Sequence, residues 1–352
     1  MKKKIKHLFI ILTPLQKVVI YQLFGDVLNR KDSLVLLSTI VDENEIFCKK
    51  EKLTNYEFSR RKLFTKPLKY LKSTRLNVQD AKGKIENLKN KYKFYEELEI
   101  VLGTDKDMFT QLFLNNLYKF SKKHHLTLVD EGIGFYMNLN FKDKVLSIIY
   151  RLITPILFGS RLYYIRRIGV YPKIDKIYLR APELLESKIK GIKYIKFNLK
   201  NKNNVKSKIA KGNVLLYSFP NQDGNISFFE KVSIITDIAN HLLKFDRNLT
   251  IKPHPRENII ELKKELSKFK NVQILDNKFS GEYINYFNYE LIINFFSSII
   301  IDLLDKDYPK EKILTIGFSN KPRIHFDKSL KYCYLKNFNA SVFINFDLWE
   351  RF

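Results

Sequence analysis

His254 has both the residue type and the backbone setting that acid–base chemistry needs. It lies between Pro253 and Pro255 in the run Thr250–Asn258 (TIKPHPREN), at the end of an apolar stretch. Each proline fixes its own φ and pushes the residue before it toward extended geometry, so the histidine is held on stiff, non-helical backbone. An imidazole gains or loses a proton near neutral pH. A lone histidine is more often structural than catalytic, and the rigid flanks keep both interpretations open here.

Two motifs carry carboxylates directly behind apolar runs. Asp130 and Glu131 stand in LVDEGIGFY, before glycines that permit a tight turn, and Asp223 stands in VLLYSFPNQDGNIS, where Asp-Gly is a strong turn signal. A carboxylate at the end of a strand can take a proton from a substrate or orient a substrate hydroxyl. The alternatives are a helix cap on a surface turn for the first motif and an ordinary loop for the second.

Ser297 and Ser298 separate a strand-like apolar run, LIINFF, from a helix-like apolar run, IIIDLL. Serine at the start of a helix satisfies free backbone N–H groups, and the same geometry can bind phosphate because these groups and the helix dipole point outward. Glu282, in KFSGEYI ahead of this strand, could accept hydrogen bonds from ribose hydroxyls. Capping alone would account for all three residues equally well.

Alternating strand and helix patterns predict the elements that position these side chains. Short continuous apolar runs are typical of parallel strands that are covered on both faces. The predicted strands are 7–13, 32–41, 98–103 and 126–132 in the first half and 213–220, 249–255, 272–276, 290–296 and 312–318 in the second. The predicted helices are 16–29, 107–123, 227–245 and 259–269. This pattern predicts two α/β domains that face each other, with the polar motifs at the carboxyl ends of the strands, where ligands of such sheets bind.

A basic polar stretch separates the two sets of elements. Nine lysines and no acidic residue lie between Lys188 and Lys211. We therefore place an N-terminal domain at 1–187, a basic linker at 188–212, a C-terminal domain at 213–325 and a tail at 326–352. The two cysteines, Cys48 and Cys333, offer neither a disulfide framework nor metal-site spacing, which indicates a reducing, cytoplasmic compartment.

The net charge of +26 calls for an anionic partner, which can be nucleic acid, acidic lipid or an anionic substrate. Neither the lysine-rich stretch nor a second basic cluster at 59–75 shows a nucleic-acid motif, so we expect no nucleic-acid partner. Lysine enrichment from an AT-rich genome would explain part of the charge.

The segment Val145–Pro172 mixes aliphatic, tyrosine and arginine residues and contains Pro155. It suits either a helix at a membrane surface or an ordinary buried helix with basic flanks. No run reaches the roughly 20 apolar residues that span a bilayer. These features predict a cytoplasmic protein that associates peripherally with the anionic inner face of the cytoplasmic membrane.

The ordered set LTPLQ, DEGIG, LLYSFPNQDG, KPHPR, SGEYI and FFSS resembles the bacterial sialyltransferases of the lipooligosaccharide type, glycosyltransferase family 52, and more distantly the bacterial polysialyltransferases. The resemblance spans residues 7 to 305. It implies an α/β fold of the GT-B type, in which an acceptor-side and a CMP-sugar-binding Rossmann-like domain enclose a cleft. It also implies inverting transfer of sialic acid from CMP-sialic acid to a hydroxyl, expected on galactose, of a lipooligosaccharide or capsule glycan, without a metal or other cofactor. A homodimer is a further expectation.

The resemblance also implies roles for individual residues. His254 would protonate or hydrogen-bond the departing CMP phosphate, Ser297 and Ser298 would hold that phosphate, and Glu282 would contact the ribose. The residues expected to complete donor binding are Pro255, Arg256 and Gln16.

The base that deprotonates the acceptor hydroxyl has two candidate positions. In the lipooligosaccharide type it would be Asp223. In the polysialyltransferase type it would be Glu131 or Asp130. Asn221 directly follows Pro220, where some relatives carry the aspartate, so both positions stay open.

Two other functions fit parts of the sequence. One is a GT-B transferase that uses another nucleotide sugar or a CDP-alcohol. The other is a basic nucleic-acid- or membrane-binding protein without catalysis. The second explains the charge of +26 but leaves the motifs at the strand ends without a role.

Overall fold

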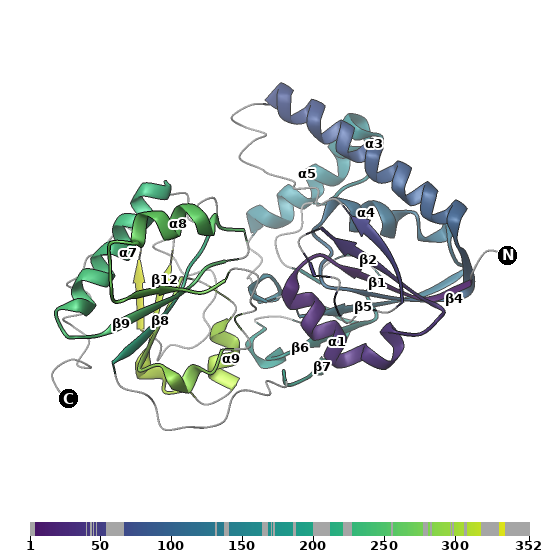
Figure 1. Cartoon of the computed structure of the whole chain (residues 1–352). Helices are drawn as coiled ribbons and strands as arrows, with labels where there is room; N and C mark the ends of the chain where they lie inside the picture. The colour runs from purple at the N-terminus through teal and green to yellow at the C-terminus, as the bar shows by residue number, and fades with distance from the viewer. Residues whose placement is uncertain are drawn as a thin grey trace. The chain divides into compact units, whose positions relative to one another are not determined.

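The computed structural model divides the chain into two compact units, 1–197 and 198–352 (Figure 1). The residues that it describes are 4–39, 41, 42, 44, 46, 48–53, 67–130, 132–136, 141–163, 168, 169, 171, 173–185, 188–199, 212–220, 227–254, 256–276, 281, 284–295, 297, 299–305, 308–317 and 331–334.

The first unit is built on a seven-stranded sheet with the order β3-β2-β1-β4-β5-β6-β7, in which every neighbouring pair is parallel. Its strands are β1 (Lys4–Ile11), β2 (Ser33–Ser38), β3 (Lys49–Leu53), β4 (Lys93–Leu102), β5 (Lys123–Val129), β6 (Lys176–Leu179) and β7 (Lys193–Lys196). All six residues of β2 are buried, as expected for a strand covered on both faces.

Helices cover both faces of this sheet. Figure 1 shows α1 on one side and α3, α4 and α5 on the other. The helices of this unit are α1 (Pro14–Leu28), α3 (Pro67–Lys91), α4 (Met108–Asn115) and α5 (Phe141–Phe158), with short 3₁₀ turns at Leu117–Lys119, Ile133–Phe135 and Pro182–Leu184. The start of α1 follows from its sequence, because the Thr13 side chain accepts a hydrogen bond from the Gln16 N–H and proline occupies the first turn.

The second unit has a six-stranded sheet with the order β10-β9-β8-β11-β12-β13, again parallel throughout. Its strands are β8 (Asn213–Tyr217), β9 (Asn248–Lys252), β10 (Val272–Ile274), β11 (Leu291–Asn294), β12 (Ile313–Gly317) and β13 (Lys331–Tyr334). Its helices are α7 (Phe228–Leu243), α8 (Ile259–Leu266) and α9 (Ile299–Asp305), with 3₁₀ turns at Tyr286–Asn288 and Lys310–Lys312.

The core of the second unit joins its central strands to α7 and α8. A reciprocal capping box between Ser227 and Glu230 starts α7, and the buried residues Ile235, Ile238 and Leu242 then form its inner face. These side chains pack in one cluster with residues of β8, β9 and β11. The loops that follow these strands therefore rest on a well-packed scaffold.

Both units share one strand order. The first strand of each unit lies near the middle of its sheet, two strands add on one side, and the fourth adds on the other. This is the Rossmann order, and ligands of such sheets bind outside the carboxyl ends of the strands where the direction of addition changes. In the second unit that point lies between β8 and β11, and in the first between β1 and β4.

Every strand predicted from the sequence is confirmed, but several boundaries differ. The helix predicted at 107–123 ends at Asn115, because a 3₁₀ turn and then β5 follow. The segment predicted as a linker, 188–212, includes β7, which pairs with β6, so the first unit continues past the expected boundary at 187 to Phe197. Part of the expected tail, Lys331–Tyr334, is β13 and pairs with β12.

Candidate active site

Three polar loops converge at the carboxyl edge of the second sheet. Ser218 follows β8, His254 follows β9 and Ser297 follows β11. Because β8 lies between β9 and β11 and all three run in parallel, these loops lie at one edge of the sheet, around the β8–β11 switch point. The structure thus brings two residues of the expected phosphate site, His254 and Ser297, to the same edge.

His254 is a partly buried, neutral histidine. Burial lowers the pKa of its imidazole from 6.5 to about 3, and the positive charge of Arg256 acts in the same direction. The Arg256 backbone N–H donates to His254 Nδ1 at 3.2 Å. Because Nδ1 accepts this bond, the single proton of the neutral ring is on Nε2. The imidazole can therefore donate one hydrogen bond through Nε2 without first taking up a proton.

Glu257 holds the loop that contains His254 in place. The sequence analysis did not single out this residue. Its carboxylate accepts hydrogen bonds from the His254 backbone N–H, from Ser218 Oγ at 2.8 Å and from Lys231 Nζ at 2.5 Å. The Glu257 and Lys231 side chains are only 2% and 3% exposed. The carboxylate thus ties together the loops after β8 and β9 and the first turns of α7. The only signal in the sequence was an acid three residues after the histidine.

A buried asparagine shapes the loop that holds Ser297. The Asn294 side chain, fully buried at the end of β11, accepts from the Ser297 backbone N–H at 2.8 Å. Its amide also donates to the Ser297 carbonyl at 3.3 Å. Ser297 Oγ accepts from the Ile299 N–H at 3.5 Å, a long bond at the start of α9. The hydroxyl of Ser297 can still donate a hydrogen bond.

Tyr217 contacts Gly281, which precedes the expected ribose contact in the sequence. Its hydroxyl donates to the Gly281 carbonyl at 3.1 Å. Gly281 has no room for a side chain, because a Cβ there would lie 2.8 Å from a ring carbon of Tyr217. This contact anchors Gly281 near the end of β8.

The acidic motif of the first unit is fixed by a buried ion pair. Asp130 is fully buried and pairs with Arg180, which donates to it from its backbone N–H and from Nε, each at 3.1 Å. Asp130 also accepts from the Tyr136 hydroxyl and from the Gly132 N–H, each at 2.7 Å. With both carboxylate oxygens engaged, Asp130 fits a role in shaping the turn rather than the role of base that the sequence had left open for it. Gly132 adopts φ 115°, a conformation that favours glycine.

Gln16 is also a structural residue rather than an exposed ligand. Its side chain is fully buried, and Oε1 accepts from the Leu12 N–H at 2.7 Å. It packs so closely on Gly103 that a Cβ there would lie 2.0 Å from Gln16 Cδ. The amide thus serves the turn between β1 and α1, and the expectation that Gln16 contacts a donor stays a prediction.

The remaining predicted residues have mixed outcomes. Arg256 is exposed and uses its backbone N–H to orient His254. Five predicted site residues lie outside the described part of the chain: Glu131, Asp223, Pro255, Glu282 and Ser298. Within the described residues, no group of histidine, cysteine, aspartate and glutamate side chains could hold a metal ion.

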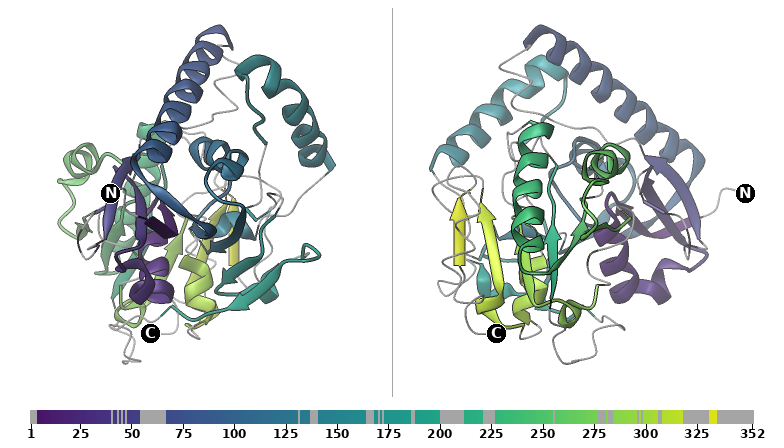
Figure 2. Two further views of the ribbon diagram at one scale, coloured as in Figure 1. Left: turned by 90° about the vertical axis from the view of Figure 1, so that its right-hand side faces the viewer. Right: turned by 60° about the vertical axis from the view of Figure 1, so that its left-hand side comes forward.

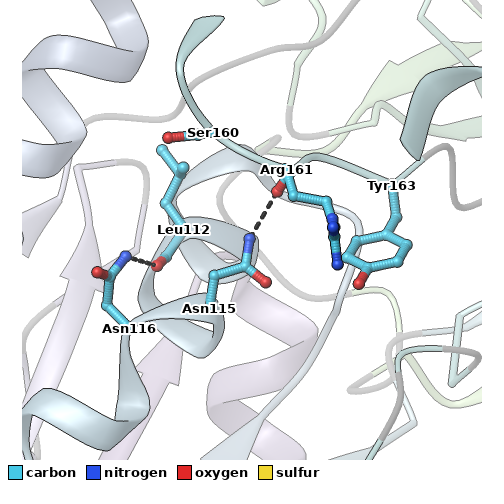
Figure 3. A pocket seen from close by; sticks show the side chains of 6 residues that line it. All are labelled: Leu112, Asn115, Asn116, Ser160, Arg161 and Tyr163. Atoms are coloured by element: carbon cyan, nitrogen blue, oxygen red, sulfur yellow. Dashed lines mark hydrogen bonds between the residues drawn. The ribbon is translucent and has the colours of Figure 1, made fainter. Parts of the chain in front are cut away.

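A pocket of about 310 Å³ lies elsewhere, in the first unit (Figure 3). Its polar groups are used within the protein, since Asn115 Nδ2 donates to the Arg161 carbonyl at 2.6 Å and Asn116 Nδ2 to the Leu112 carbonyl at 2.7 Å. None of the predicted site residues lines it, so the pocket is separate from the candidate site.

Solved structures with a similar arrangement of elements identify the fold. A Methanocaldococcus jannaschii UDP-GlcNAc 2-epimerase, solved with UDP-GlcNAc and UDP, matches with a TM-score of 0.52 and 13% identity, over 97% of this chain and 91% of the other. A Burkholderia vietnamiensis α,α-trehalose-phosphate synthase (UDP-forming) matches with a TM-score of 0.50 and 9% identity, over 98% and 91%. At such low identity these likenesses show the fold alone, which is GT-B, as the sequence predicted.

The family follows from the sequence match. The family model described as alpha-2,8-polysialyltransferase (POLYST) matches residues 7–304, most of the chain, and the chain belongs to this family. The polysialyltransferase part of the predicted resemblance is thereby confirmed, and the chain is a glycosyltransferase. The likeness to glycosyltransferase family 52 stays a prediction. No curated protein is significantly similar to the chain in sequence.

Proposed function

We propose that the protein transfers sialic acid from CMP-sialic acid to a hydroxyl of a bacterial surface glycan, with inversion and without a metal. The observation that carries this proposal is the neutral His254, whose Nδ1 is occupied and whose Nε2 is left to donate, at the same sheet edge as the Ser297 loop. The family of the chain supports the choice of a sialyl donor.

The proposed step forms one bond and breaks another. The acceptor oxygen attacks the anomeric carbon of the sialyl group, and the bond from that carbon to the phosphate oxygen breaks with its electron pair on the phosphate. Nε2–H of His254 and the hydroxyl of Ser297 then hydrogen-bond the departing CMP phosphate, where negative charge grows. The acceptor proton passes to a carboxylate, because a carboxylate is a competent general base near neutral pH.

Two carboxylates remain as candidates for that base, Asp223 and Glu131. In favour of Glu131, it directly follows Asp130, which Arg180 holds in place. In favour of Asp223, it follows β8, the strand at the centre of the candidate site. Of these two assignments we propose Asp223, and the amide variants described in the Discussion decide between them.

The acceptor is a second element of the proposal. The sequence favoured galactose, whereas the family description, alpha-2,8-polysialyltransferase, favours a terminal sialic acid.

We propose that the acceptor belongs to a capsule or lipooligosaccharide glycan and that the enzyme works at the inner face of the cytoplasmic membrane. Among the described residues, none of the helices has the length and apolar character that crossing a bilayer requires.

The proposal is tested by incubating the purified chain with CMP-N-acetylneuraminic acid and two soluble acceptors, one ending in galactose and one in sialic acid. Mass spectrometry should show acceptor that has gained sialyl residues, and EDTA should not change the rate. UDP-GlcNAc and a CDP-alcohol serve as competing donors. Replacing His254 by alanine should slow both transfer and donor hydrolysis by about 10²–10⁴-fold. Transfer from UDP-GlcNAc or the CDP-alcohol and not from the sialyl donor would overturn the proposal.

A further inference from the structure

Helix α5 exposes a continuous apolar face. Its large apolar side chains recur three and four residues apart, which places them on one side of a helix. The most exposed are Phe141 (79%), Ile148 (60%), Leu152 (66%) and Ile156 (84%). The other exposed members of this α5 face are Val145, Ile149, Ile153 and Leu157. Folded proteins rarely expose so large a contiguous apolar surface unless something covers it.

The opposite side of α5 packs on the first unit. Thr154 and Phe158 are buried, and Thr154 Oγ1 donates to the Tyr150 carbonyl and accepts from the Leu162 N–H, each at 2.8 Å. Helix α3 packs against α5, and Lys82 of α3 donates to the Gly159 carbonyl, where α5 ends. Figure 2 shows the two helices meeting at one end of this unit. The contacts of its opposite side therefore hold α5 in place, and its apolar face stays exposed.

Charge identifies the partner. The sequence from 141 to 161 contains four basic residues, Lys142, Lys144, Arg151 and Arg161, and one acid, Asp143. Arg151 and Arg161 are exposed, and the guanidinium carbon of Arg151 lies 5.9 Å from the centre of the Tyr163 ring. An apolar helix face with exposed arginines on the helix and just after it matches the boundary between acyl chains and anionic headgroups. A second copy of this chain docked through α5 would instead bring two sets of cations together.

We propose that α5 lies in the surface of an anionic phospholipid bilayer, with the α5 face among the acyl chains and its arginines at the headgroups. This inference rests on the proposed membrane location but not on the proposed transfer chemistry. It takes up one of the two interpretations of Val145–Pro172 that the sequence left open, the membrane-surface helix.

The test compares two triple variants of the full chain. The α5 variant carries Ile148→Gln, Leu152→Gln and Ile156→Gln, and glutamine preserves helix propensity. The control variant carries Tyr118→Gln, Leu243→Gln and Ile260→Gln, which are also exposed large apolar residues but lie on other elements. Co-flotation uses vesicles of phosphatidylglycerol and phosphatidylcholine. The wild type and the control variant should float, and partition of the α5 variant should fall by at least about tenfold, because three apolar side chains no longer leave water.

A second measurement separates insertion from protein contacts. Leu152→Trp in a Trp349→Phe background should shift its emission to the blue with these vesicles and be quenched by brominated lipid. Equal flotation of all variants, or an unchanged spectrum, would overturn the proposal. A third result would also overturn it: the wild type sediments as a dimer, the α5 variant sediments as a monomer, and the α5 variant still binds vesicles. A chain that inserts through α5 but transfers no sialic acid would refute the proposed function alone.

Discussion

The buried pair of Glu257 and Lys231 predicts a large and specific effect of removing one charge. Glu257→Gln keeps the size of the side chain but leaves Lys231, 3% exposed, without its counter-charge. Breaking a buried ion pair from one side costs about 3–5 kcal/mol, and Lys231→Met should cost a similar amount. The double variant removes both charges, so it should be about 2–3 kcal/mol more stable than the sum of the single effects predicts.

The function should fall along with the stability. Glu257 holds the His254 backbone N–H, and a displacement of about 1 Å at a reacting group can cost about 10²-fold in rate. We therefore expect a lower kcat for Glu257→Gln, measured as sialyl transfer per folded molecule. Glu290→Gln is the matched control, because Glu290 is a buried acid paired with Arg247 at the opposite, amino edge of the same sheet. It should destabilise the second unit comparably and leave kcat unchanged.

The assay must report on the second unit itself, because a chain of two units need not unfold in one transition. Hydrogen exchange of peptides from β8 and β9, followed by mass spectrometry, measures the opening of this unit locally. A loss below about 1 kcal/mol in Glu257→Gln would refute the argument, since a buried, unpaired lysine could not be so well tolerated. Strictly additive single variants, or equal kcat losses in Glu257→Gln and Glu290→Gln, would refute it as well.

Three further predictions concern other residues. Because burial lowers the His254 pKa from 6.5 to about 3, NMR of ¹³C-labelled histidine should show one ring, absent in His254→Gln, that stays neutral from pH 8 to pH 5. Since the unfolded chain takes up this proton more readily, stability is lost as pH falls below 6.5, by about 2 kcal/mol at pH 5 relative to His254→Gln in urea unfolding. Asp223→Asn should abolish transfer while sparing hydrolysis of CMP-sialic acid, and if Glu131→Gln shows that pattern instead, the base belongs to the acidic motif. Gly103→Ala should lower thermal stability by about 1–3 kcal/mol through its clash with Gln16, and Gln16→Ala should recover part of that loss.

The amino-acid sequence was sufficient to predict the central strands of each sheet and the helices that follow them. Strands such as β2 and β8 are short unbroken apolar runs, and the starts of α1 and α7 carry recognisable caps at Thr13 and Ser227. The edges were harder to predict, because an exposed edge strand is often charged. The edge strand β3 reads KKEKL and gives no apolar signal. Helix α3 was missed because its buried residues, such as Val78 and Ile85, stand among many charges.

Candidate site residues could be predicted only where a motif of a few consecutive residues marks them. His254 between two prolines and the serine motif near Ser297 can be recognised within a few residues. The groups that orient them cannot, because Glu257 pairs with Lys231 across 26 positions and Asp130 with Arg180 across 50. Such pairings depend on which strands become neighbours, and no local pattern encodes that. The structural role of Asp130 was missed for the same reason.

The strand order of the second sheet also sets the sequence in which a growing chain can complete it. β8 emerges first, β9 and β10 extend one flank, and β11 opens the other. The edge that bears His254 and Ser297 is thus complete before β12 has been synthesised. Until β12 and β13 arrive, β11 would present a row of unpaired backbone groups to neighbouring chains. Pairing with β12 therefore covers the edge of β11, the strand that precedes Ser297.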